Sequence, residues 1–288
     1  MEQTFSIKNL SKHYQDFSLQ NINLSLPKGT ILGLIGENGA GKSTIIKCLL
    51  NLIHRDNGEI TIFDQTLEQN PKKIKDQIGV VFDECHFHGI LNLKQINQIM
   101  KYSYTKWDEK RFFKLCWQFQ LPEHKKIQTY SRGMQMKLSL ACALSHHAKL
   151  LILDEPTSGL DPVTRNEILD LFLEFIQQED NSIMLSTHIT SDLDKIADYI
   201  CCIHRGRVLF TDEKDQLLER CIKVKGPAYM LDELEMNSFI YVEKNAFHFT
   251  GMVKDIENWK RHYPDLIYEK PTLEEIMVDY TKKAQKNI

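Results

Sequence analysis

The residues best suited to chemistry form one short stretch, Gly36 to Thr44, which reads GENGAGKST. It matches the pattern G-x-x-x-x-G-K-[ST], in which glycines let successive backbone N–H groups curl around a phosphate. The apolar run 31–35 before it predicts a buried strand, and 45–52 after it predicts a helix. Because a helix N-terminus adds free N–H groups and partial positive charge, this order favours a phosphate site over a plain glycine-rich turn. There, Lys42 supplies a charge for the β- and γ-phosphates and Ser43 offers a hydroxyl to Mg²⁺.

A second set of polar residues follows apolar runs that also predict buried strands. Asp154 ends the run 150–153, where a nucleotide-binding sheet places a carboxylate for Mg²⁺, and Glu155 beside it can polarise an attacking water. A purely structural carboxylate pair at this place would cost desolvation energy without a partner. His188 follows the run 182–186. Alone, such a histidine is most often structural, and it becomes a donor to a γ-phosphate only with the rest of the set.

Tyr14 lies in a polar break between two predicted strands. An exposed aromatic ring there could stack on a base. The ring could equally pack at a strand end, and the local sequence favours neither interpretation.

The surrounding elements predict an α/β fold. Residues 1–30 alternate apolar and polar, which is typical of half-buried antiparallel strands. Strands then alternate with helices, which predicts a mainly parallel core sheet. Residues 91–134 interrupt this pattern as a helical insert, whose aromatic residues either pack in the core or form a docking surface for a partner: Trp107, Phe112, Phe113 and Trp117.

From residue 221 the pattern restarts with short segments, which predicts a small α+β appendage without a catalytic site. The expected strands are 222–224, 239–242 and 247–249, and the expected helices are 253–261 and 274–280.

Composition restricts the function further. The chain has 288 residues, 42% of them apolar, and a net charge of −3, so we expect no broad basic face and no nucleic-acid partner. Its seven cysteines lack framework or zinc-ligand spacing, which indicates reduced thiols in a cytosolic protein, and the adjacent Cys201 and Cys202 are predicted to pack in the core. We expect no secretory signal and no membrane span, because no apolar run reaches the ~18 residues that a bilayer requires. A role at a membrane would then need another chain to span it.

Six motifs in order resemble those of the ATP-binding cassette (ABC) of ABC transporters, over roughly residues 4–220. They are a Walker A motif at 36–44, a signature sequence at 130–135, a Walker B motif with its glutamate at 150–155, a D-loop at 158–161, a switch histidine at 187–188 and an adenine-stacking aromatic at Tyr14. The resemblance implies a P-loop NTPase cassette with a mainly parallel core sheet, an antiparallel N-terminal β subdomain, the helical insert and the small C-terminal α+β appendage. It divides the chain into an ATP-binding domain at 1–220, with a helical subdomain at about 91–134, and an accessory domain at 221–288.

The resemblance also implies cofactors and site residues. ATP and Mg²⁺ are the expected cofactors, with Glu155, His188 and Lys42 as catalytic residues and with Ser43, Asp154 and Asp83 at the metal. The implied nucleotide-binding residues are Tyr14, Asn38, Gly39, Ala40, Gly41, Lys42, Ser43, Thr44, Ser131, Gly133 and Asp161. In the family, two cassettes dimerise head to tail, and each signature sequence contacts the γ-phosphate held by the opposite subunit. A homodimer or a paired ATPase subunit is therefore implied.

Three positions depart from the family pattern. Arg132 and Met134 stand where glycine and glutamine are commonest, a variation seen in exporter-type members. Asp83 stands where the family usually has a glutamine that couples the γ-phosphate and Mg²⁺ to the helical subdomain. A carboxylate can still ligate Mg²⁺, but when ionised it cannot donate a hydrogen bond. Asp83 could instead point away and cap a turn.

The motif set is most similar to bacterial exporters of the antibiotic, peptide or multidrug type. We therefore expect an ATP-hydrolysing subunit that drives an integral membrane permease on a separate chain, and that is cytoplasmic and peripheral on the inner face of the cell membrane. A soluble ABC-type ATPase acting on the ribosome or DNA is the alternative, although such proteins usually carry two cassettes, long coiled coils or basic segments. A small-molecule P-loop kinase would not explain the signature sequence or His188.

Overall fold

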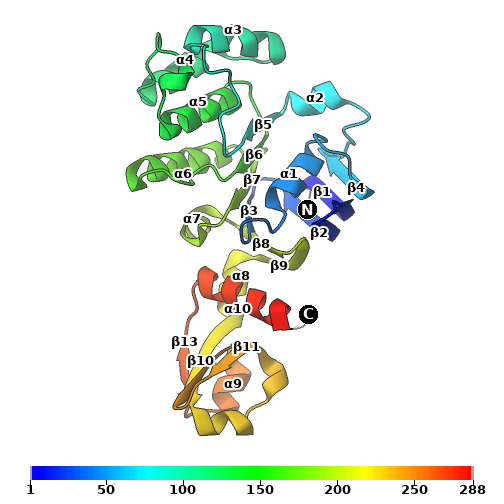
Figure 1. Cartoon of the computed structure of the whole chain (residues 1–288), viewed down its shortest axis with the longest axis vertical. Helices are drawn as coiled ribbons and strands as arrows, with labels where there is room; N and C mark the ends of the chain where they lie inside the picture. Colours follow the sequence, from blue (N-terminus) through cyan, green and yellow to red (C-terminus); the bar gives the residue numbers. More distant parts are fainter. Residues whose placement is uncertain (1, 287–288) are drawn as a thin grey trace.

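A six-stranded sheet forms the core of the computed structural model, which describes residues 2–286 (Figure 1). Its strand order is β5-β6-β7-β3-β8-β9, and only the last pair is antiparallel. The strands are β3 (Ile31–Ile35), β5 (Ile78–Val81), β6 (Leu150–Asp154), β7 (Ser182–Thr187), β8 (Tyr199–His204) and β9 (Arg207–Glu213). Every residue of β3, β6 and β7 is buried, as expected for parallel strands covered on both faces. The predicted α/β fold with a mainly parallel core sheet is confirmed.

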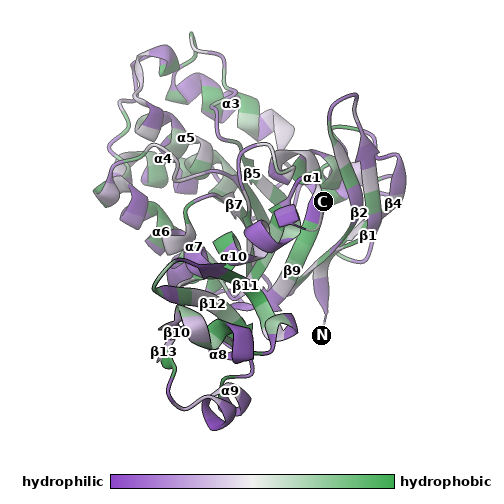
Figure 2. Cartoon of the chain, turned by 60° about the horizontal axis from the view of Figure 1, so that its bottom comes forward, coloured by the Kyte–Doolittle hydropathy of each residue, from purple (hydrophilic) through white to green (hydrophobic). Residues whose placement is uncertain are grey.

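Alternate side chains of these strands enter two hydrophobic clusters, one on each face of the sheet. Leu151 and Leu153 join one cluster, while Leu150 and Ile152 join the other. Cys201 and Cys202 divide in the same way and are fully buried, so their predicted core packing is confirmed. Figure 2 shows the central strands coloured mostly for hydrophobic residues. The helices between the strands, apart from those of the helical insert, are α1 (Lys42–Leu49), α2 (Pro71–Lys75), α5 (Arg132–Leu144), α6 (Pro162–Ile176) and α7 (Thr190–Ile196), and α8 (Lys214–Arg220) follows β9.

A three-stranded antiparallel sheet, in the order β2-β1-β4, packs beside the core, as predicted for the N-terminal region. Its strands are β1 (Gln3–His13), β2 (Ser18–Pro27) and β4 (Asn57–Ile62). The inward residues Phe5, Ile7 and Leu24 belong to the same cluster as Leu32 of β3, so the two sheets share one core.

The helical insert comprises α3 (Leu93–Ser103), α4 (Glu109–Gln118), the 3₁₀ turn η1 (Ile127–Thr129) and the start of α5. Its aromatic residues divide between the two predicted roles. Phe112 is fully buried, and Trp107 donates its indole N–H to Asn97 Oδ1 at 2.8 Å. Trp107 and Phe113 are half-buried, whereas Trp117 is 80% exposed and presents the largest accessible surface of the four.

The C-terminal unit, residues 221–286, builds a separate four-stranded antiparallel sheet in the order β11-β12-β10-β13. It contains β10 (Cys221–Pro227), β11 (Phe239–Lys244), β12 (His248–Lys254), β13 (Ile267–Glu269), the 3₁₀ turns η2 (Ala228–Glu233) and η3 (Met236–Ser238), α9 (Ile256–His262) and α10 (Leu273–Lys286). Phe249 and Trp259 centre its own hydrophobic cluster. The last two residues, 287 and 288, lie outside the described part.

One helix prediction in this unit is wrong at its start. Val253 was predicted to begin a helix but lies in β12, where it pairs with Ile222. The helix begins at Ile256, because Asp255 adopts a left-handed backbone conformation (φ 64°) and accepts a hydrogen bond from Asn258 N. The apolar run around Val253 suited both a strand and a helix, and pairing with β10 decided between them.

Candidate active site

The loop 36–41 turns between β3 and α1 and requires its glycines. A Cβ on Gly36 would lie 2.3 Å from the carbonyl oxygen of Ile203, and one on Gly41 would lie 2.7–2.8 Å from Leu19 and Phe17. Gly39 and Gly41 also have positive φ angles of 80° and 113°, which side chains rarely tolerate. The backbone curl predicted from the glycine pattern is thus a property of this loop.

Helix α1 begins at Lys42, earlier than the predicted 45–52. Gly41 precedes it as N-cap, and no side chain caps the helix. The N–H groups of Lys42, Ser43 and Thr44 therefore start the helix without a capping partner, which is the arrangement that binds anions.

Lys42 lies at the centre of the site and is only 6% exposed. Its Nζ donates to the Gly36 carbonyl at 2.7 Å and lies 3.4 Å from the Glu37 carbonyl. It also forms an ion pair with Glu155 Oε1 at 3.3 Å. That contact lacks hydrogen-bonding geometry, so the buried Oε1 atom has charge compensation but no hydrogen-bond donor.

Strand ends bring the predicted acidic residues and histidine next to Lys42. Asp154 at the end of β6 is 4% exposed and accepts a hydrogen bond from Ser186 Oγ on β7. Glu155 follows with a left-handed backbone (φ 51°), and its N–H donates to the Ser186 carbonyl at 3.0 Å. Its second carboxylate oxygen, Oε2, lies 2.8 Å from His188 Nδ1. Lys42, Glu155 and His188 therefore form one contact network.

Tyr14 is 49% exposed and lies near the loop through Phe17. The two rings are 6.5 Å apart and stacked, and the Phe17 ring, together with Leu19, leaves no room for a Cβ on Gly41. Lys12 Nζ lies 5.6 Å from the Tyr14 ring centroid. This exposure agrees with the base-stacking interpretation, and the contact with Phe17 agrees with packing at a strand end.

The signature residues lie apart from this network. Ser131 is exposed and caps α5 by accepting a hydrogen bond from Met134 N at 3.3 Å. Within residues 2–286, no hydrogen bond or ion pair joins Ser131 or Gly133 to the loop 36–41. Gly133 instead neighbours Leu160 and Thr164, so the signature sequence lies beside the segment 158–161.

Asp161 is the N-cap residue of α6. Its Oδ1 accepts hydrogen bonds from Val163 N and Thr164 N at 3.1 and 3.0 Å. These contacts lower the pKa of Asp161 below its ordinary value, and the hydrogen bond from the Thr164 N–H has the largest effect. Asp161 therefore remains ionised and holds the start of α6.

Asp83 lies outside the network of Lys42 and Glu155. It is exposed in the segment after β5, and within residues 2–286 its side chain makes neither a hydrogen bond nor an ion pair. The geometry thus shows no turn-capping contact.

Sequence reasoning missed Ser186, which fixes one oxygen of Asp154. The signal was a polar residue at the end of an apolar strand, directly before Thr187. It also missed the buried Asp192, which accepts a hydrogen bond from Thr157 Oγ1 at 2.6 Å. No short motif marks that pair, since 35 residues separate its members.

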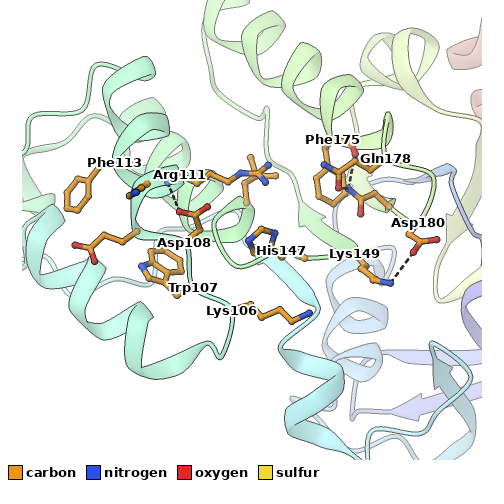
Figure 3. Close-up of a pocket in the computed structure, with 15 residues that line it drawn as sticks. Lys106, Trp107, Asp108, Arg111, Phe113, His147, Lys149, Phe175, Gln178 and Asp180 are labelled. Atoms are coloured by element: carbon orange, nitrogen blue, oxygen red, sulfur yellow. Dashed lines mark hydrogen bonds and ion pairs between the residues drawn. The ribbon is translucent and has the colours of Figure 1, made fainter.

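A cavity of about 1170 Å³ lies elsewhere, between the helical insert and the core (Figure 3). Lys106, Trp107 and Arg111 line its insert side, while His147 and Lys149 line its core side. Lys149 stands directly before β6, at the opposite end of the strand from Asp154, and pairs with Asp180 at 3.1 Å. None of the predicted site residues lines this cavity, so its size does not identify the reaction site.

The glycine loop at the start of α1 and the acidic strand end beside it define the chain as a P-loop nucleoside triphosphatase. The family model that matches is described as ABC transporter, over residues 19–158. The lantibiotic transport ATP-binding protein SrtF of Streptococcus pyogenes is 35% identical over 216 residues, covering 73% of this chain and 90% of SrtF. The bacitracin transport ATP-binding protein BcrA of Enterococcus faecalis is 32% identical over 214 residues, covering 73% and 69%.

Solved structures agree in fold. An ATP-binding subunit of an ABC transporter superposes with a TM-score of 0.69 at 28% identity, covering 75% of this chain and 92% of that one. The cassette MJ0796, solved as a dimer bound to ADP and Pi, has a TM-score of 0.64 at 23% identity, covering 73% and 98%. This chain belongs to the ABC transporter family as an ATP-binding subunit, and it binds and hydrolyses ATP. No helix within residues 2–286 is long and apolar enough to cross a membrane.

Replacing Lys42 by Ala is expected to weaken ATP binding by about 100-fold or more, because a buried phosphate cluster loses its main counter-charge. Calorimetry on the purified chain measures this affinity. Lys47→Ala is the matched control, since Lys47 is exposed near the other end of α1. Equal ATP affinity in Lys42→Ala and the control would contradict this placement of the site.

Proposed function

We propose that this chain is the ATPase subunit of an exporter for antimicrobial peptides, working with a permease on a separate chain at the inner face of the membrane. The cluster of Lys42, Glu155 and His188 at the glycine loop is the observation that carries the hydrolytic role. The transport of bacitracin and of a lantibiotic by the relatives BcrA and SrtF supports the substrate class. We also propose residues 1–220 as the ATP-binding domain and 221–288 as an accessory domain, supported by the separate sheet and hydrophobic cluster of residues 221–286.

In this proposal the Lys42–Glu155 ion pair is a resting contact. Entering phosphates attract the Lys42 ammonium, because they carry more negative charge than one carboxylate. Glu155 Oε1 then loses its only cation while still lacking a hydrogen-bond donor, so it can accept a proton from an attacking water. His188, hydrogen-bonded to Oε2, keeps the carboxylate oriented and presents its other ring nitrogen to the γ-phosphate.

The residues present suit Mg²⁺, which prefers hard oxygen ligands. Ser43 offers a hydroxyl at the start of α1, and Asp154 a buried carboxylate whose Oδ1 is fixed by Ser186. When bound with ATP, Mg²⁺ supplies charge neutralisation between the β- and γ-phosphates. We propose that Asp83 approaches this site only in its presence, because a carboxylate facing a γ-phosphate is otherwise repelled.

The exposure of Ser131 supports a site completed by a second subunit. Gly133 lies in the first turn of α5, where glycine is less favourable than alanine. Yet a Cβ there would come no closer than 3.6 Å to a neighbour within the chain. Packing within the chain therefore does not require a glycine here, and we propose that Gly133 and the exposed Ser131 contact a γ-phosphate held by a homodimeric or paired subunit.

A hollow of about 520 Å³ beside β5 is the proposed permease contact. Phe82, Phe87 and Tyr104 line it, and Asp83 stands between Phe82 and Glu84, which also borders it. A partner seated there touches both the insert and the segment that carries Asp83. Movement of either one with the nucleotide state would then reach the membrane chain.

Replacing Glu155 by Gln is expected to leave ATP binding intact and to slow hydrolysis by at least about 100-fold, because it removes the general base while keeping the shape. Trapped ATP should then hold two chains together, which size-exclusion chromatography with ATP and Mg²⁺ detects. Glu179→Gln, an exposed carboxylate between α6 and β7, is the control. Normal hydrolysis, or a mutant that stays monomeric, would refute the role or the shared site.

Replacing Asp83 by Gln in the Glu155→Gln background is expected to make ATP-driven dimerisation less dependent on Mg²⁺ concentration, because the neutral amide is not repelled by phosphate. Stepped magnesium titrations of dimer formation measure the midpoint. Glu84→Gln controls for the loss of a neighbouring exposed charge. If the Asp83→Gln midpoint equals that of the parent, Asp83 takes no part in metal-dependent closure.

The exporter assignment is tested by co-purification of the tagged chain from membranes with a multi-span permease. Phe87→Ala is expected to reduce the recovered permease while sparing the ATPase activity of the purified subunit. Trp117→Ala, at an exposed position elsewhere on the insert, should retain it. If only Trp117→Ala reduces the recovered permease, the permease contact lies at Trp117 instead of the hollow. If the chain sediments with ribosomes and not with membranes, the exporter assignment is wrong.

A further inference from the structure

The buried Asp192 joins three segments that carry proposed catalytic and interface residues. It lies in α7, four residues after His188, and is 2% exposed. Its Oδ2 accepts a hydrogen bond from Thr157 Oγ1 at 2.6 Å, and Thr157 follows Glu155 by two residues. Its Oδ1 accepts one from Arg165 Nε at 2.5 Å, in the first turn of α6.

These contacts close a ring. Glu155 contacts His188 at 2.8 Å, the chain continues from His188 to Asp192, Asp192 binds Thr157, and the chain returns to Glu155. Displacement of the segment that carries Glu155 relative to the segment that carries His188 therefore strains the Thr157–Asp192 bond. The Thr157–Asp192 bond is shielded from water, since Thr157 is 1% and Asp192 2% exposed, and a bond without competing water is more rigid.

Arg165 extends the ring to the segment beside the signature sequence. Its N–H donates to the Asp161 carbonyl at 3.0 Å, and its Nη2 donates to Ser191 Oγ at 3.0 Å. Arg165 thus ties both α7 and the Asp161 turn to one carboxylate. Leu193 and Ile196 of α7 also pack in the core cluster, so apolar contacts hold the same helix.

We infer that Asp192 is a positioning residue for ATP hydrolysis: it holds Glu155 and His188 in one geometry and links both to Asp161. It does not touch the nucleotide. Its carboxylate is suited to this task because its two oxygens accept hydrogen bonds from donors in two different segments. An amide of the same size has one acceptor oxygen, and an alkyl side chain has none. The inference rests on the proposed roles of Glu155 and His188.

The main test replaces Thr157, because a substitution at that position leaves the contact between Asp192 and Arg165 in place. Thr157→Val, which keeps the shape and removes the donor, should lower kcat about 10- to 100-fold, as small misplacements of catalytic groups do. The KM for ATP should change by less than about threefold, since binding at Lys42 is untouched. Thr157→Ser retains the hydroxyl and should restore most of kcat. Asp192→Asn should resemble Thr157→Val or be more severe.

Two measurements distinguish the proposed positioning role of Asp192 from a purely structural role. Thr4→Val removes another buried hydrogen bond, to Ser182 Oγ at 2.7 Å at the far end of β7, and should lower the melting temperature without lowering kcat. In the His188→Ala background, Thr157→Val should cost little further activity, because its effect passes through the lost contact.

Unchanged kcat in Thr157→Val, or a fully additive loss in the double variant, would overturn the inference. Either result leaves the proposed function standing, provided that wild-type hydrolyses ATP and Glu155→Gln does not. Absence of hydrolysis by wild-type would instead count against the proposed function.

Discussion

The site depends on one constraint, the parallel alignment of three adjacent buried strands. In the order β6-β7-β3, Asp154 lies in register with Ser186, and Thr187 with Ile35. The acidic pair, the histidine and the glycine loop therefore emerge at one edge of the sheet, although 152 residues separate Gly36 from His188. Parallel strands run in the same direction, so residues that follow them share that edge.

This alignment places Glu155 in a restrained position. It adopts a left-handed backbone, buries one carboxylate oxygen without a donor and relies on Lys42 and His188 for its remaining contacts. Such a position is costly for a structural residue, because non-glycine side chains disfavour that conformation. Burial of the strands before and after it, together with the hydrogen bond from its N–H to Ser186, offsets this cost.

The C-terminal unit is tied to the same edge through its last helix. Leu273 and Ile276 of α10 enter the core cluster that also holds Leu193 of α7, and Tyr280 packs on Phe210 at 4.7 Å. Figure 1 shows α10 lying between the core sheet and the C-terminal sheet. The helix that follows His188 is therefore covered by a segment from the end of the chain, and a change in this unit reaches α7 by direct packing.

The sequence alone determined the parts of this protein that local patterns encode. Glycine spacing and apolar runs identified the glycine loop and the buried strands, because each depends on neighbours a few residues away. Only the tertiary structure decided the contacts between distant segments. It brought Lys42 to Glu155, left Asp83 and Ser131 outside that network, assigned Val253 to a strand and buried Asp192 against Thr157. Those outcomes depend on strand order and on which groups lose contact with water, and no short stretch of chain contains that information.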